Sequence, residues 1–120
     1  MTLPPFSAQS AYTRATAALT LAEEESLSTA LDLGGYTPVG LITPAALTNA
    51  AITFQVSADG ETFYPLCDGG NVPLSLAVST AAARAYPLNP RDFLGWRYLK
   101  IETAEAEAAD RVFQIVVRPV

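Results

Sequence analysis

The stretch AITFQVSADGETFYPL, residues Ala51–Leu66, decides the fold of this chain. Apolar and polar residues alternate over 52–57, which is the two-residue period of a half-buried β-strand. The dipeptide Asp59-Gly60 follows and suits a turn that requires a positive φ. Strand-forming residues then resume at 62–64. The stretch therefore predicts a β-hairpin.

The other segments of the chain are short, rich in β-forming residues and separated by turn residues. Together with the hairpin they predict about eight short strands and no long helix, so we expect an all-β fold, an antiparallel β-sandwich of the jelly-roll type. Ser26–Leu33 fits a helical turn or a strand, and Arg84–Leu88 is a short extended piece. The clearest further strands are Ala15–Leu21, Tyr36–Thr43, Val72–Val78, Trp96–Thr103 and Arg111–Val117.

Single residues refine this prediction. Leu99 and Ile101 should face the core, and Arg111–Val117 is apolar enough for a central strand. Pro38 belongs at the start or on an edge of its strand, where a missing N–H group is tolerated. Asn89-Pro90 predicts a brief capped helical turn. Pro44–Asn49 is a connection in which Pro44 could begin one turn of helix.

The chain divides into an extended N-terminal arm, residues 1–14, and a single β-sandwich domain, residues 15–120. The arm has no periodicity, and it fits either a frayed terminus or a segment that lies on a neighbouring subunit. Phe6 and Tyr12 would anchor such a contact, and we include Arg14 among the candidate contacts with a capsid protein or subunit.

Composition excludes several classes of function. The formal net charge is −5 and the seven Lys and Arg residues are scattered, which argues against nucleic-acid binding. The chain has no histidine and one cysteine, Cys67, so it lacks the residues for a Ser-His-Asp triad, a Cys-His pair or an internal disulfide. No apolar run approaches the roughly 20 residues of a membrane span, and the first residues do not resemble a secretory signal.

Carboxylates and the thiol offer no convincing chemistry. Glu23–Glu25 reads as a solvated turn rather than a cation site, because calcium needs oxygens that converge on one point. Ala104–Asp110 reads as an acidic loop between two strands. A glycosidase pair would have to come from residues in turns, and Cys67 has no histidine to activate it. We therefore expect no enzyme, no cofactor and no metal site. The carboxylates considered were Asp59, Glu61, Asp68 and Asp92.

Three aromatic residues are candidates for contact with a glycan or a partner. The rings of Tyr64, Tyr86 and Trp96 could stack on sugars, or they could fill the core of the sandwich and its rim. Nearby arginines could form ion pairs with carboxylates of this chain or of a neighbouring subunit, which would fix register more than affinity.

Two motifs resemble a known fold family. ITFQVSADGETFY (52–64) is similar to the strand, S-x-DG-x-x-[FW] hairpin of discoidin-like, galactose-binding-like jelly rolls, and WRYLKI (96–101) is similar to their later ARYVRI strand. The resemblance implies the jelly-roll architecture. It implies no binding site, because no ligand-binding loop of that superfamily has a match here.

A longer resemblance covers roughly Ser26–Val120. SLSTALDLGGYTPVGLITPAALTNAAITFQVSADGETFYPLCDGGN, NPRDFLGWRYLKIET and ADRVFQIVVRPV are similar to a family of small structural proteins encoded by tailed phages and prophages. The chain departs from that family at Ala104–Ala109, where a Gly/Ser/Thr-rich loop is expected, and at Cys67, where an aromatic is expected. Because of the difference at Ala104–Ala109, the resemblance does not indicate which surface contacts a partner.

The phage resemblance implies a virion component, made in the host cytoplasm and placed on the capsid exterior as a decoration or cement protein or as the base of a head fibre. The expected partners are the major capsid protein and further copies of this chain, with a trimer as the expected oligomer. The alternatives are a carbohydrate-binding module that attaches the virion to a host-surface glycan, or a tail component.

Overall fold

The computed structural model describes residues 14–120 of the chain, which form nine strands and one short 3₁₀-helix. Phe6, Tyr12 and most of the expected arm therefore lie outside the described residues. The elements are β1 (Ala15–Leu21), β2 (Leu31–Asp32), β3 (Tyr36–Thr43), β4 (Ala51–Ser57), β5 (Tyr64–Pro65), β6 (Ser75–Ala77), β7 (Arg84–Pro87), η1 (Pro90–Asp92), β8 (Tyr98–Glu102) and β9 (Arg111–Pro119).

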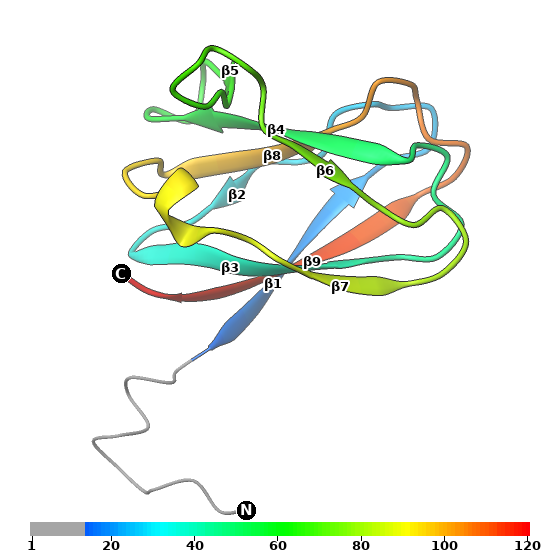
Figure 1. Ribbon diagram of the computed structural model, residues 1–120, viewed down its shortest axis with the longest axis horizontal. Helices are drawn as coiled ribbons and strands as arrows, with labels where there is room; N and C mark the ends of the chain where they lie inside the picture. The colour runs from blue at the N-terminus through cyan, green and yellow to red at the C-terminus, as the bar shows by residue number, and fades with distance from the viewer. Residues whose placement is uncertain (1–13) are drawn as a thin grey trace, which may run out of the picture.

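The strands form two antiparallel sheets that face each other (Figure 1). One sheet has the order β1-β9-β3-β7, and the other has the order β2-β8-β4-β5, with β6 also paired to β4. The expected all-β sandwich is confirmed. The pairs β1–β9, β2–β8, β3–β7 and β4–β6 are nested, as in one long hairpin that has been rolled up. This nesting is the topology of a jelly roll.

The core lies between the two sheets and is built by alternation along the strands. Leu99 and Ile101 of β8 and Phe113 and Ile115 of β9 are all fully buried, as the period of two requires. β9 lies between β1 and β3, so the prediction of a central position is confirmed. Pro38 lies near the start of β3, just before the point where β7 pairs with that strand, so its missing N–H group disrupts no ladder there.

The decisive hairpin is present, but its connection is longer than expected. β4 pairs with only two residues of β5, and residues 58–63 form a loop in which the Asp59 carboxylate accepts hydrogen bonds from the N–H groups of Glu61 and Thr62. Gly60 has a φ of 81°, as its sequence context indicates. The hydrogen bonds from Thr62 and Glu61 lower the pKa of Asp59 below its ordinary value.

Two other predictions were wrong in part. The strand expected over Val72–Val78 is limited to β6. Val72 is 57% exposed, so it does not continue the row of inward-facing residues that the alternation predicted. Pro44–Asn49 forms no helical turn. The capped turn after Asn89 is confirmed as η1, where the Asn89 side chain accepts a hydrogen bond from the N–H group of Arg91.

Candidate functional site

One end of the sandwich is open, and we call it the arm end because residues 1–13 precede β1 there. The strand registers define it: Ala15 of β1 pairs with Val117 of β9, and Tyr36 of β3 pairs with Pro119. Strands β1 and β3 therefore begin at the end of the sandwich where β9 finishes. Two adjoining hollows with Tyr36 in common occupy this end.

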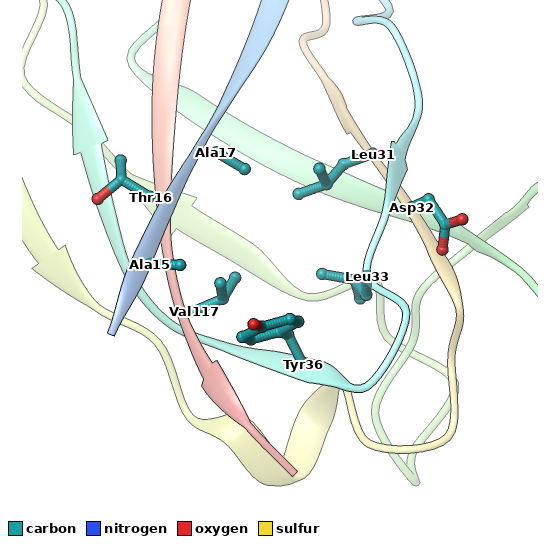
Figure 2. A pocket seen from close by; sticks show the side chains of 8 residues that line it. All are labelled: Ala15, Thr16, Ala17, Leu31, Asp32, Leu33, Tyr36 and Val117. Carbon is teal, nitrogen blue, oxygen red and sulfur yellow. The ribbon is translucent and has the colours of Figure 1, made fainter. Parts of the chain in front are cut away.

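The first hollow is a pocket of about 230 Å³ between the edge strands of the two sheets, β1 and β2. Figure 2 shows Ala15 and Ala17 pointing from β1 toward the β2 side, whereas Thr16 points away. Buried Val117 of β9 lies between Ala15 and Tyr36 in the pocket wall. The pocket is mainly apolar, and its lining residues are Ala15, Thr16, Ala17, Leu31, Asp32, Leu33, Tyr36 and Val117.

The pocket exists because β1 carries small residues where it begins. The inward positions of β1 are Ala15, Ala17, Leu19 and Leu21, and both leucines are fully buried. A leucine side chain fills the space between two sheets, while an alanine side chain leaves much of it empty. The sandwich is therefore well packed along the later half of β1 and hollow at its beginning.

The second hollow, of about 290 Å³, surrounds the loop before β8. Its exposed apolar members are Tyr36 (43% exposed), Leu94 (48%), Trp96 (39%) and Val120 (78%). Large apolar side chains that gather on one surface and stay exposed mark interaction sites more often than single exposed ones do.

A charged pair stands between the two hollows. The Arg97 guanidinium contacts both carboxylate oxygens of Asp32, with Nε–Oδ1 and Nη2–Oδ2 distances of 3.1 Å. The hydrogen bond from Arg97, with the charge of that residue, lowers the pKa of Asp32. Because Asp32 lines the first hollow and Arg97 the second, the arm end presents an apolar surface with a fixed polar pair in its middle.

The candidate aromatics are distributed over three separate elements. Trp96 lines the second hollow together with Tyr36, which was not among the candidate residues. Tyr64 is 62% exposed on β5, in the opposite sheet from Tyr86 on β7. Tyr86 packs partly against the core, and its hydroxyl accepts a hydrogen bond from the N–H group of Ser79. Neither Tyr64 nor Tyr86 lines the hollow that contains Trp96.

Of the candidate contact residues in the arm, the structure describes Arg14 alone. It is exposed and directly precedes β1, so it stands at the rim of the arm end. Cys67 is half-buried, and its Sγ lies 3.7 Å from the carbonyl oxygen of Pro65.

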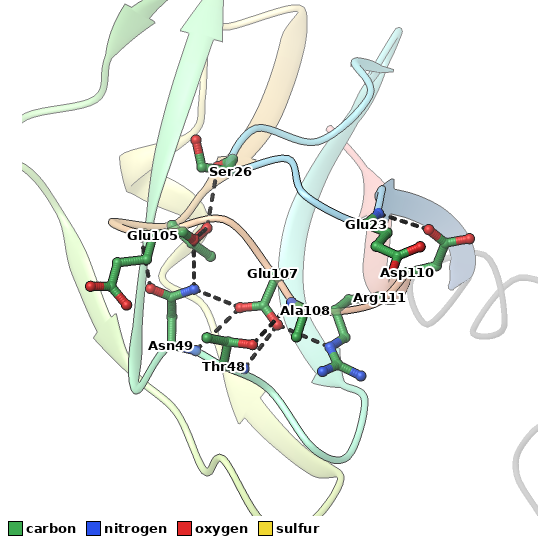
Figure 3. Close-up of polar contacts among 10 residues, drawn as sticks. Glu23, Ser26, Thr48, Asn49, Glu105, Glu107, Ala108, Asp110 and Arg111 are labelled. Atoms are coloured by element: carbon green, nitrogen blue, oxygen red, sulfur yellow. Dashed lines mark hydrogen bonds and ion pairs between the residues drawn. The ribbon is translucent and has the colours of Figure 1, made fainter.

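The far end of the sandwich, opposite the arm end, is closed by a buried carboxylate that the sequence argument missed. Ala104–Asp110 was expected to be an acidic loop between two strands; it is a loop, but Glu107 within it is 1% exposed. Its carboxylate accepts four hydrogen bonds, which come from the N–H groups of Thr48 and Asn49, the Asn49 side-chain amide and Nε of Arg111 (Figure 3).

Glu107 joins three loops through its side chain and its backbone. The backbone of Glu107 also pairs with Glu24 and Glu25, so the acidic turn after β1 is held against the loop before β9. Burial raises the pKa of Glu107, but the hydrogen bonds from Thr48, Asn49 and Arg111 outweigh that effect and leave the pKa below its ordinary value. Every buried polar side-chain atom of the described residues, those of this network included, has a hydrogen-bond partner.

The described residues provide no site for a metal ion made of His, Cys, Asp and Glu side chains. They also include no helix that is long and apolar enough to cross a membrane. The two adjoining hollows and the exposed apolar side chains that line one of them make the arm end the candidate functional site of the part of the chain that the structure describes.

Neither a protein-family model nor a curated protein sequence matches this chain. Among solved structures, the chain is similar to the SPBc2 prophage-derived protein YomS, with a TM-score of 0.51 and 13% sequence identity. The similarity covers 88% of this chain and 94% of that one. At this identity the likeness shows a shared fold over nearly the whole of both chains.

Proposed function

We propose that this chain is a non-enzymatic phage structural protein that binds the outer surface of the capsid as a decoration or cement protein. The observation that carries the proposal is the exposed apolar surface of the arm end, where Tyr36, Leu94, Trp96 and Val120 line one hollow. Such a surface fits a protein partner better than a small substrate. The prophage origin of a protein with the same fold supports the phage assignment.

Cross-bridging would be the physical mechanism. Each copy would bury its arm end against a major capsid protein, and a closed oligomer, expected to be a trimer, would hold several capsid proteins at once. Because the decoration protein binds the assembled lattice and not its separated subunits, each occupied site would stabilise the assembled state by RT ln(1 + [L]/Kd), where [L] is the free concentration of the decoration protein.

A capsid-binding experiment tests this proposal. Capsids that lack the protein are incubated with the purified full chain, and occupancy is read by cryo-electron microscopy. We expect regular density at the capsid symmetry axes and at least a tenfold loss of affinity for Leu94→Glu. The matched control is Val72→Glu, because Val72 is similarly exposed but does not line either hollow of the arm end. Absence of wild-type binding, or equal binding by both variants, would refute the proposal, and density on tails would favour the tail alternative.

One observation favours a second candidate function, attachment to a host-surface glycan. Trp96 and Tyr36 expose their rings in the same hollow, and the Asp32–Arg97 pair beside them offers polar groups. An aromatic face flanked by polar groups suits the mixed surface of a sugar. This candidate predicts a hit on a glycan array that Trp96→Ala abolishes and Tyr64→Ala leaves intact. An array without any hit would remove it.

A further inference from the structure

We propose that the pocket between β1 and β2 is the receptor for the N-terminal arm of a second copy of this chain, and that the ring of Phe6 enters it. The occupant is thus a named segment of the protein, residues 1–13, that precedes the described residues. That this contact forms on a virion rests on the proposed function. The contact itself can be tested with purified protein and without phage particles.

The pocket has the size and polarity for one aromatic ring. A cavity of about 150 Å³ lined by apolar side chains is enough to hold benzene, and this pocket measures about 230 Å³. Its walls are apolar and are formed by Leu31, Leu33 and Val117. On the β1 side the small side chains of Ala15 and Ala17 leave room for a ring. The one charged side chain of its lining, Asp32, is already paired with Arg97.

The edge of β1 beside the pocket can also accept a strand. Thr20 directs its N–H and C=O groups away from β9, because they bond to Thr29. The two-residue period then directs the corresponding groups of Thr16 and Ala18 to the same outer edge. Within residues 14–120, the outward N–H and C=O groups of Thr16 and Ala18 make no hydrogen bond. An extended segment placed here would gain backbone hydrogen bonds while its side chains reach the pocket.

The sequence of residues 1–13 suits this position. MTLPPFSAQSAYT carries no charged side chain, so entry beside the apolar pocket would not require removing a charge from water. Phe6 and Tyr12 are six residues apart, which places both rings on the same face of an extended strand. Pro4-Pro5 favours an extended backbone just before Phe6.

Turn chemistry favours a second copy over the chain's own arm. Because β1 begins at Ala15 beside the pocket, the chain's own Phe6 could return only through a reversal between Ser7 and Arg14. This segment contains no Gly, Pro, Asn or Asp, and its turn-forming residues are limited to Ser7, Ser10 and Thr13, whose hydroxyls support tight turns more weakly. An arm that continues outward from β1 instead reaches up to about 3.3 Å per residue, which is enough to meet a neighbouring subunit.

Site-directed disulfide cross-linking tests the inference on the full chain. Two single-cysteine proteins are prepared in a Cys67→Ala background, one with Phe6→Cys and one with Ala17→Cys, then mixed and mildly oxidised. Mass spectrometry measures the peptide that links positions 6 and 17. We expect at least tenfold more of this product than with the matched control Ala18→Cys, whose side chain lies on the outer face of the same strand.

Each outcome decides the inference. Equal cross-linking to positions 17 and 18, or no cross-linking in mixtures of folded proteins, overturns it. Failure of the mixture combined with an intramolecular disulfide in a Phe6→Cys, Ala17→Cys double variant assigns the pocket to the chain's own arm and also overturns it. A positive cross-link with no binding to capsids would leave the inference standing and refute the proposed function.

Discussion

Replacing Glu107 with alanine is expected to lower the free energy of unfolding by about 3–5 kcal/mol, the range found when one partner of a buried ion pair is removed. The change would leave the Arg111 guanidinium, whose side chain is 13% exposed, without its carboxylate. It would also remove the acceptor for the N–H groups of Thr48 and Asn49, and buried donors without partners are destabilising.

Urea denaturation of the full chain, followed by circular dichroism, measures this effect. The matched control is Glu105→Ala, because Glu105 lies in the same loop but its side chain is exposed and only its backbone joins the network. The control should stay within about 0.5 kcal/mol of the wild type, as is usual for surface substitutions. A Glu107→Ala midpoint equal to that of the control would contradict the structural role of the network.

The same carboxylate makes stability dependent on pH. The folded-state pKa of Glu107 lies below the ordinary value of 4.5, so its contribution is present above pH 4.5 and is lost as the pH falls through the folded-state pKa. Wild-type stability should therefore decline on acidification below about 4.5 more steeply than that of Glu107→Gln, which cannot titrate. Parallel curves for the two proteins would exclude this contribution.

The second large effect is expected at Gly60. Its φ of 81° lies in the left-handed region, and a Cβ atom there would come within 3.0 Å of the Tyr98 ring. Backbone strain of about 1–2 kcal/mol and displacement of the ring should act together, so Gly60→Ala is expected to destabilise the protein by about 2 kcal/mol. Thermal or urea unfolding provides the measurement.

The matched control for this prediction is Gly69→Ala. Gly69 lies in another exposed loop, has no positive φ and has open space where its Cβ would be. Its substitution should be neutral or slightly stabilising, since alanine restricts the unfolded chain. If both substitutions had the same effect, the Asp59-Gly60 geometry would not be the feature that constrains the decisive hairpin.

Alternation in the sequence predicted the strands, but not their partners. β1 and β3 match the predicted segments because local periodicity determines which residues face the core. The nested pairing could not be predicted in the same way, because Ala15 pairs with Val117 across almost the whole chain. The decisive hairpin lies at the tip of this nesting, where partners are close in sequence and the pattern is most informative.

The candidate site was predicted only in part, for the same reason. The aromatic character of Trp96 makes it a candidate, whereas the sequence around Tyr36, which lines the same hollow, predicts only a strand. The acidic composition of AEAEAAD predicts a loop but not the burial of Glu107, because its partners Thr48 and Asn49 are 59 and 58 residues away in the chain. The spacing of four between Glu107 and Arg111 indicates an ion pair only on a helix, and here it joins a loop to the start of β9.

The closed far end and the open arm end imply that the sandwich does not fluctuate uniformly. Amide hydrogens of the loops joined by Glu107 should exchange slowly, at rates that approach global unfolding, because opening there breaks a buried network. Amides near Ala15 and Ala17 should exchange through smaller local openings, since little packing holds that part of β1. A partner that covers the arm end would then suppress the most frequent local opening of the molecule. Bound copies would therefore become more rigid at the end of the sandwich that is least rigid in the isolated protein.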